Sequence, residues 1–293
     1  MPGKKMLILA MALNPIFMAQ MVSYSADGTL NSLSLFYVAY IFMLKKKEKI
    51  RIVDMIVVFI SSIIISLSKV IYFPFVFMVF LLSDKQFRTK KSAGLYKLFT
   101  FICSLTMGII WFCIAKSYLF DTVSADVRPN MQFKYILSHI YLAPQIAFNT
   151  ISEYIYGWTC QLFGGVFGQG WLTYKDIIWM IFGGVVIVEL FTSRKDEEEA
   201  DKIVKKDRIM IWASVILIIG LTFSSLYVQW TAYQADMVHG IQGRYFIPLV
   251  LPIGIAVRRK RVDGSCIKRS IIEVICLLFA VMMAIVNTMQ AYT

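Results

Sequence analysis

Nine apolar stretches run through this 293-residue chain, and they constrain its fold more than any other feature. A helix needs roughly 20 apolar residues to cross a bilayer whose hydrocarbon core is about 30 Å thick. Hydrophobic residues make up 58% of the chain and charged residues 16%, against roughly 45–50% and about 25% in soluble domains. The sequence therefore excludes a soluble globular protein and predicts an all-α, polytopic transmembrane helix bundle, with residues 1–293 forming a single integral membrane domain.

The stretches predict about nine spans, and a count of eight or ten is also compatible with them. Three of them (30–44, 70–82 and 245–257) are short for a straight crossing, so they are either extended by flanking residues or form buried, broken helices. We expect the first stretch to stay in the protein rather than be cleaved as a signal peptide, because Asn14-Pro15 interrupts it. The predicted spans are approximately 6–24, 30–44, 52–68, 70–82, 94–117, 177–193, 209–228, 245–257 and 271–289.

Positive charge is concentrated in a few loops, which accounts for the formal net charge of +12. The loops 45–51, 84–91, 194–208 and 258–269 fall on one side if the chain has nine spans and a cytoplasmic N-terminus. Lys and Arg prefer the cytoplasmic side of a membrane, so we expect that topology, with the C-terminus outside. The charge then serves orientation and contact with anionic membrane lipids, and no nucleic-acid partner is needed.

The segment 118–176 is too long for a simple connection and is predicted to lie on the outer side. Residues 131–157 alternate apolar and polar groups with a helical period, which predicts amphipathic helices lying in the membrane interface, broken near Pro144. Residues 158–171 are rich in glycine and are expected to form a loop with close backbone approaches.

Two ionisable residues lie at the predicted outer ends of spans. Asp27 is a candidate general base or contact for a sugar hydroxyl; alternatively, Asp27 or Asn31 caps the second span by accepting backbone N–H groups. Lys69 could neutralise a phosphate near the outer head groups, or its ammonium could simply extend to the interface.

The segment from Gln242 to Tyr245 enters the eighth predicted span from outside. The guanidinium fork of Arg244 matches phosphate oxygens, while Gln242 could add an amide contact and Gly243 could let a ligand approach closely. The alternative is that Arg244 and Tyr245 anchor the span at the interface. We favour phosphate binding, because an arginine on the outer side runs against the positive-inside tendency.

Acidic and aromatic side chains lie together in the outer segment. Glu153, Tyr154 and Trp158 could hold a sugar through a carboxylate and ring faces, and the glycine-rich stretch adds Gln169 and Trp171 as further sugar-contact candidates. The other reading of these aromatic residues is a belt at the membrane surface.

Catalytic and metal-binding patterns are missing from the sequence. It contains no P-loop, GxSxG, HExxH or EF-hand pattern, and its five cysteines and two histidines predict neither a disulfide framework nor a zinc site. No cofactor is evident, and a divalent-metal requirement stays open. Asp54, Glu189 and Glu273 are placed near cytoplasmic ends of spans, where nearby basic residues would balance them.

Four segments in a fixed order carry a family resemblance. They are an Asp-Gly turn opening a span in PIFMAQMVSYSADGTLN, a Ser-Lys before an apolar hairpin in SLSKVIYFPF, then FGGVFGQGW, and last GIQGRYFIPLVLP. In these segments the chain resembles the DUF2142 family of bacterial polytopic membrane proteins, which is grouped with GT-C-type glycosyltransferases. The chain looks N-terminally shortened, since only SADGTLN separates its first two spans where such enzymes carry a large outer loop with an acidic residue.

The resemblance implies a GT-C-like, glycosyltransferase-like protein of cell-envelope polysaccharide assembly in the bacterial cytoplasmic membrane. Its expected partners are a polyprenyl-phosphate-linked sugar and other glycan-assembly proteins. A carboxylate would orient or deprotonate the acceptor hydroxyl, and cations would stabilise the departing phosphate. Two alternatives stay open: a transporter or flippase of a lipid-linked or small polar substrate, and a non-catalytic assembly partner.

Overall fold

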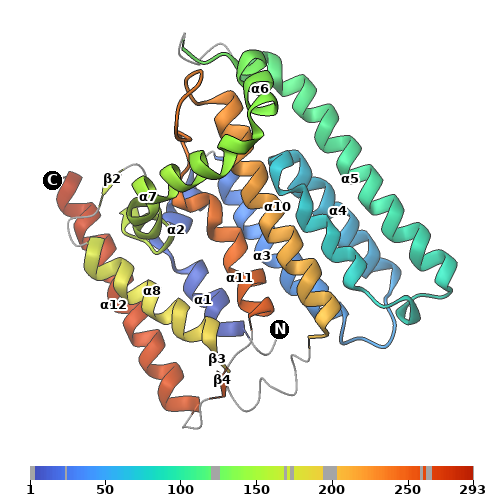
Figure 1. The fold of residues 1–293 in the computed structure, drawn as a ribbon. Helices are drawn as coiled ribbons and strands as arrows, with labels where there is room; N and C mark the ends of the chain where they lie inside the picture. The colour runs from blue at the N-terminus through green and yellow to red at the C-terminus, as the bar shows by residue number, and fades with distance from the viewer. Residues whose placement is uncertain are drawn as a thin grey trace.

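Helical backbone covers most of each apolar stretch in the computed structural model (Figure 1). The structure describes residues 4–23, 25–119, 126–167, 170–171, 175–193, 203–257, 260–261 and 266–292. The α-helices are α1 (Lys5–Ala12), α2 (Pro15–Val22), α3 (Ala26–Leu44), α4 (Ile52–Ser68), α5 (Lys90–Leu119), α6 (Pro129–Ser138), α7 (Ala143–Leu162), α8 (Lys175–Phe191), α10 (Lys205–Gln229), α11 (Ile247–Ala256) and α12 (Cys266–Tyr292). The 3-10 helices are η2 (Val70–Leu81), η3 (Asp84–Gln86), η5 (Ile140–Leu142) and η6 (Gly243–Phe246).

Four two-residue strands complete the described elements. They form an antiparallel pair, β1 (Val166–Phe167) with β2 (Gly170–Trp171), and a parallel pair, β3 (Thr192–Ser193) with β4 (Lys260–Arg261). The fold is therefore helical, as the sequence predicts.

Three helices in the described part of the chain are long and apolar enough to cross a membrane, by length and composition. They lie in α5, α10 and α12, and the bent pair α1–α2 would make a fourth. The segments α4, η2 and η6–α11 are apolar but shorter. A helical membrane protein is thus supported, whereas the nine spans expected from the sequence stay a prediction.

The first apolar stretch is broken rather than straight, because α1 and α2 meet at an angle of 60°. Asn14 occupies the break: its Oδ1 accepts from the backbone N–H of Ile16 at 3.0 Å, and its Nδ2 donates to the carbonyl of Leu162 at 2.7 Å. Pro15 starts α2 at a position where its missing N–H costs no hydrogen bond. The bend is therefore held by a cap and tied to the end of α7.

Replacing Asn14 by alanine is expected to lower the free energy of unfolding by about 2 kcal/mol, because a helix cap and a buried hydrogen bond are lost together. Asn14→Ser keeps a capping oxygen, but its side chain cannot reach Leu162. The stability of this variant should therefore lie between those of the wild type and Asn14→Ala. Thermal unfolding in detergent measures both. An Asn14→Ala protein as stable as the wild type would contradict this account.

A one-residue break separates α4 from η2 and determines where Lys69 lies. Lys69 has extended backbone (φ −156°, ψ 116°) and is both the residue after α4 and the residue before η2. Pro74 lies inside η2, and a proline has no N–H to donate within a helix. The two segments pack against each other, so the chain reverses at Lys69 and places that residue at one end of the bundle.

The predicted basic loops meet at the opposite end. The ammonium of Lys45, after α3, forms an ion pair with Asp207 in the first turn of α10. Arg208 Nε donates to the carbonyl of Ala256 at the end of α11, at 2.8 Å. Gln86 Nε2 donates to the carbonyl of Leu44 at 2.7 Å. These bonds join helix ends that lie in the lower half of Figure 1.

Acidic residues at this basic end have cationic partners, as expected for Asp54. Lys47 Nζ lies 2.9 Å from its carboxylate, which also accepts from the hydroxyl of Tyr40 at 2.7 Å. A hydrogen bond from Lys97 holds the pKa of the Asp84 carboxyl below its ordinary value.

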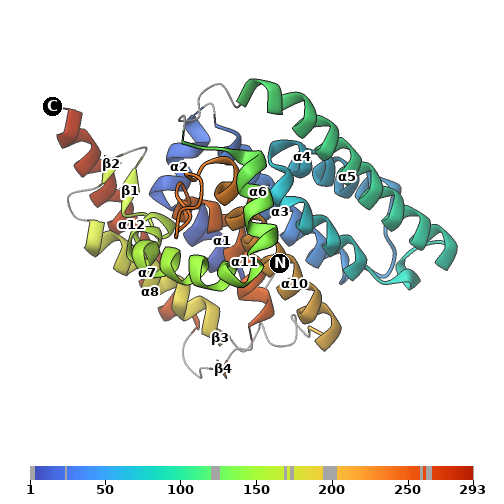
Figure 2. The ribbon, with the colours of Figure 1, turned by 45° about the horizontal axis from the view of Figure 1, so that its top comes forward.

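The segment between α5 and α8 contains the expected break. Proline at position 144 falls in the first turn of α7, after the short η5, so the amphipathic stretch forms two helices. Helix α7 runs across the end of the bundle in both Figure 1 and Figure 2. The expected loop over 158–171 is partly wrong, because α7 continues to Leu162 and only the residues after it leave the helix.

Two apolar clusters hold these elements together. The larger one fills the bundle and includes the fully buried Leu7, Tyr37, Phe75 and Phe182. The smaller one packs α7 against the end of α10 and the segment before η6, through Ile146, Trp158, Tyr227, Val238 and Ile241. The second cluster thus connects α7 to the end of the bundle where Lys69 lies.

Candidate functional site

Three ionisable residues from three distant parts of the chain meet at the end opposite the basic loops. Asp27 lies in the first turn of α3 and is 6% exposed. One oxygen of its carboxylate forms an ion pair with Lys69 Nζ, and the other lies 3.5 Å from Arg244 Nε. The sequence-based candidates Asp27, Lys69 and Arg244 are therefore brought together, and two cations share one carboxylate.

The cluster's formal charge favours an anion. Two cations and one carboxylate leave one positive charge, and the side chains of Lys69 and Arg244 are 30% and 28% exposed. A buried carboxylate stabilises two neighbouring cations at the cost of its own hydration. An incoming phosphate oxygen could therefore replace Asp27 as the partner of either cation.

Local capping explains the conformation of Asp27 and corrects one expectation. Ser25 caps α3, because its Oγ accepts from the backbone N–H of Asp27 at 3.2 Å. Asn31 does not cap the helix either; its Nδ2 donates to Gln20 Oε1 at 2.6 Å. The predicted cap by Asp27 or Asn31 is thus wrong, and a serine two residues upstream leaves the Asp27 carboxylate free to pair with cations.

The ring of Tyr245 contacts both cations. Lys69 Nζ lies 4.5 Å from the centre of the Tyr245 ring, and the guanidinium carbon of Arg244 lies 5.9 Å from it. Tyr72, in η2, donates its hydroxyl to the backbone carbonyl of Tyr245 at 2.8 Å. Sequence reasoning missed Tyr72, which looks like an ordinary core residue within an apolar run.

The segment that carries Arg244 is held against α7. The backbone N–H of Gly243 donates to Gln161 Oε1 at 2.6 Å, and a Cβ at position 243 would lie 2.8 Å from the carbonyl carbon of Trp158. Gln242 precedes η6, and its carbonyl accepts from the N–H of Tyr245 at 3.0 Å. Gly243 is therefore required by the close approach of two backbones, whereas the sequence suggested room for a ligand.

The aromatic candidates on α7 take part in packing. Trp158 is 6% exposed, and its Nε1 donates to the carbonyl of Ile241 at 2.9 Å. Its indole stacks on Tyr154 and meets Phe223 and Phe246 edge to face. The geometry thus makes Trp158 a packing residue that supports η6.

The remaining sugar-contact candidates differ in how they are placed. Glu153 is exposed on α7, and the hydroxyl of Tyr154 lies 3.1 Å from His239 Nδ1. Gln169 falls outside the described residues, and Trp171 is described only as part of β2. A sugar-binding role for these four residues stays a prediction.

Two adjoining cavities open beside Lys69. The first has a volume of about 260 Å³, with Lys69, Ser68 and Tyr245 among its polar lining and Trp111 and Phe112 among its apolar lining. The second, of about 500 Å³, is lined mainly by apolar side chains of α6, α7 and α10. Both are lined by Val70, Ile71, Phe112, Ser225 and Gln229.

The chemistry of these cavities is amphipathic. A cation and polar groups occur at one end, and apolar surface extends away from them beneath α6 and α7. Among the described residues, no group of three His, Cys, Asp or Glu side chains could hold a metal ion. What this arrangement can bind through its described side chains is therefore an anionic group attached to an apolar chain.

A family of predicted membrane proteins, DUF2142, has a sequence model that matches residues 1–253 of this chain. The matched range contains the whole Asp27, Lys69 and Arg244 cluster and both adjoining cavities. No curated protein and no solved structure matches the chain significantly.

Proposed function

The chain belongs to the DUF2142 family of predicted membrane proteins, and from this premise we propose that it is a glycosyltransferase-like protein of cell-envelope polysaccharide assembly. It handles a polyprenyl-phosphate-linked sugar at the outer face of the bacterial cytoplasmic membrane. The observation that carries the proposal is the position of Lys69, which pairs with Asp27 and also lines the amphipathic cavity. A lipid phosphate combines the two chemistries that meet there.

The position of the cluster supports the proposed side of the membrane. Asp27 begins α3, Lys69 follows α4, and Arg244 precedes α11, whereas the basic loops join the other ends of α3, α10 and α11. Positively charged loops favour the cytoplasm. The proposal therefore places the N-terminus in the cytoplasm and the cluster outside.

The three residues have separate roles in the proposed reaction. Lys69 and Arg244 bind the phosphate and stabilise the negative charge that grows on it as the sugar departs. Once the phosphate has replaced Asp27 as their partner, the Asp27 carboxylate is available to orient or deprotonate the acceptor hydroxyl. The ion pair thus holds the carboxylate in place until the phosphate binds.

Binding of undecaprenyl phosphate and of its glycosyl ester to the purified protein in nanodiscs tests the proposal. Lys69→Met is expected to weaken binding by about tenfold or more, because it removes a charge-assisted contact worth about 1.5–3 kcal/mol. Lys45→Met is the matched control, because it removes a lysine that is also paired with an aspartate but lies at the basic end.

The outcomes separate the proposal from its alternatives. Binding with transfer of the sugar to an acceptor supports a glycosyltransferase, and binding without transfer supports an assembly partner that presents the lipid. A folded wild-type protein that binds neither lipid would overturn the proposal.

One observation favours a transporter as the second candidate. Discontinuous helices frequently form the substrate sites of transporters, and the chain has a 60° break between α1 and α2 and a break at Lys69. Flux of a lipid-linked sugar across proteoliposomes, abolished by Lys69→Ala, would favour this function over transfer.

A further inference from the structure

Two polar residues near the end of α10 line the same cavity as Lys69. Helix α10 packs against η2, the segment that begins directly after Lys69. Ser225 and Gln229 are four positions apart, so they lie one helical turn apart on the same face of α10. Both line the cavity of about 260 Å³ beside Lys69. That cavity therefore has a cation on one wall and uncharged polar groups on another.

Most of the surface of this cavity is apolar, so its polar groups are few. The Ser68 hydroxyl donates to the carbonyl of Ile64 at 2.8 Å. The Thr222 hydroxyl donates to the carbonyl of Ile218 at 2.7 Å, so both hydroxyls are used within their own helices. Ligand sites are commonly apolar cavities in which a few placed polar groups fix the orientation of the ligand. Apart from the indole of Trp111, the polar side chains in the lining are Ser68, Lys69, Thr222, Ser225, Gln229 and Tyr245.

The hydroxyl of Ser225 and the amide of Gln229 are unused within the protein. Both side chains are half-buried, and neither has a hydrogen-bond partner among the residues that the structure describes. A serine or threonine within a helix can bond back to the carbonyl four residues earlier, as Thr222 does and Ser225 does not. Unpaired polar groups are costly in apolar surroundings. A hydroxyl and an amide in this lining therefore point to a ligand whose oxygens accept hydrogen bonds.

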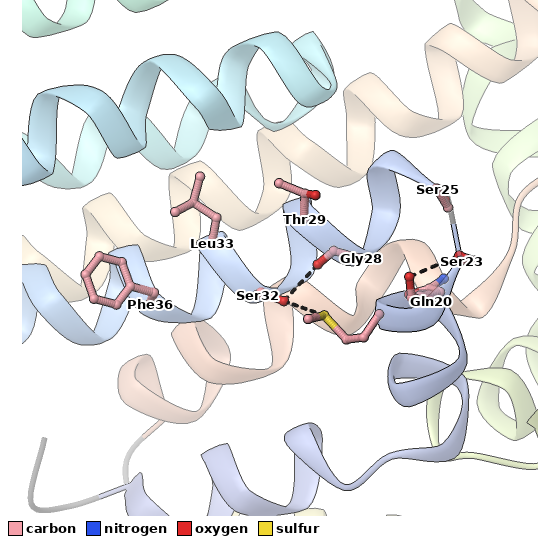
Figure 3. Close-up of a pocket in the computed structure, with 9 residues that line it drawn as sticks. Gln20, Ser23, Ser25, Gly28, Thr29, Ser32, Leu33 and Phe36 are labelled. Carbon is pink, nitrogen blue, oxygen red and sulfur yellow. Dashed lines mark hydrogen bonds between the residues drawn. The ribbon is translucent and has the colours of Figure 1, made fainter.

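A cavity of about 330 Å³ between α2 and α3 shows the difference (Figure 3). There, Ser23 Oγ donates to the carbonyl of Gln20 at 3.0 Å, and Ser32 Oγ donates to the carbonyl of Gly28 at 2.8 Å. No described residue that lines it is Lys, Arg, Asp or Glu. That cavity thus lacks the combination of a cation with unused donors that distinguishes the cavity beside Lys69.

Ser225 and Gln229 also lie at the boundary of two cavities. Besides the cavity beside Lys69, both line the apolar cavity of about 500 Å³ beneath α6 and α7. A ligand held between Lys69 and these two residues can therefore extend into apolar surroundings. A phosphate ester of a long-chain alcohol has this form, since its charged oxygens accept hydrogen bonds and its chain is apolar.

We propose that Ser225 and Gln229 donate hydrogen bonds to oxygens of the phosphate group that Lys69 binds. The inference rests on the proposed function, and it adds an uncharged wall on α10 to the head-group site. Lys69 attracts anions in general, whereas a hydroxyl and an amide at fixed positions recognise where the acceptor oxygens lie. The phosphate belongs either to a membrane lipid or to a free phosphate from the water.

Binding of undecaprenyl phosphate to the purified protein in nanodiscs tests the inference, with undecaprenol as the probe that lacks the phosphate. Ser225→Ala and Gln229→Leu should each weaken binding of undecaprenyl phosphate about tenfold, because each removes a donor to a charged group. Binding of undecaprenol should not change. Gln229→Glu keeps the size of the side chain but brings a negative charge towards the phosphate, so it should weaken binding more than Gln229→Leu does.

Ser224→Ala is the matched control. Ser224 is the neighbour of Ser225 on α10, but it is exposed and lines the larger cavity without lining the one beside Lys69. This variant should bind both lipids as the wild type does. Thermal unfolding of all four variants identifies any change that acts through folding.

The outcomes separate the inference from the proposed function. A loss restricted to undecaprenyl phosphate supports the inference, and binding of inorganic phosphate with the same dependence on Gln229 identifies free phosphate as a source. Equal binding of undecaprenyl phosphate by the wild type, Ser225→Ala and Gln229→Leu, or an equal loss of undecaprenol, would overturn the inference and leave the role of Lys69 intact. A folded wild-type protein that binds neither undecaprenyl phosphate nor its glycosyl ester would overturn the proposed function, and the inference with it.

Discussion

Replacing Asp27 by asparagine is expected to lower the free energy of unfolding by about 2 kcal/mol. The substitution keeps the shape of the side chain but leaves Lys69 and Arg244 facing each other without a counter-charge. Breaking a fully buried ion pair costs about 3–5 kcal/mol, and an exposed one is worth up to about 1 kcal/mol. The value expected here lies between them because the cations are 30% and 28% exposed.

A double substitution tests the cause of this loss. Asp27→Asn combined with Lys69→Gln removes both partners, and the double variant should be more stable than the sum of the single changes predicts, by about 1–2 kcal/mol. Asp84→Asn is the matched control: Asp84 also pairs with a lysine, but its side chain is 51% exposed. Strictly additive effects would show that the pair does not stabilise the fold, and equal losses in Asp27→Asn and Asp84→Asn would show that burial of the Asp27 carboxylate does not strengthen its pair.

The single variant Asp27→Asn also separates lipid binding from sugar transfer. If a lipid phosphate competes with Asp27 for Lys69 and Arg244, removal of the carboxylate should strengthen binding of undecaprenyl phosphate. Sugar transfer should be lost, because the group proposed to orient the acceptor is gone. Weaker lipid binding by Asp27→Asn would contradict the competition, and unchanged transfer would remove Asp27 from the proposed chemistry.

The sequence predicts the helices well because length and hydropathy act locally. The stretch 52–68 coincides with α4, and the break near position 144 appears where a proline cannot continue the preceding helix. The interruption at Asn14-Pro15 is visible in the sequence, but the 60° angle between α1 and α2 and the 3-10 backbone of η2 depend on packing against other elements, so apolar composition alone did not indicate them.

The members of the charged cluster could be predicted, but their arrangement could not. Charges at ends of apolar stretches are expensive unless they are paired or functional, which singled out Asp27, Lys69 and Arg244. Whether Lys69 extends to water or pairs with a carboxylate depends on contacts between residues 42 positions apart.

Gly243→Ala is expected to destabilise the protein by about 3 kcal/mol or more, the upper range for overpacking of a tight interior. A Cβ at this position would fall well inside van der Waals distance of the carbonyl oxygen of Trp158 and 2.8 Å from its carbon. Backbone of a helix cannot rotate away as a side chain would. The strain must therefore separate η6 from α7 and move Arg244 away from Asp27.

Gly220→Ala provides the control for this substitution. Gly220 lies within α10, and nothing is within 4 Å of a Cβ added there, so alanine should stabilise the helix by about 1 kcal/mol. Thermal unfolding of both variants in one detergent should therefore shift in opposite directions, and Gly243→Ala should also lose lipid binding because its effect reaches Arg244. If Gly243→Ala and Gly220→Ala unfold at the same temperature, then the contact between η6 and α7 does not hold Arg244 in place.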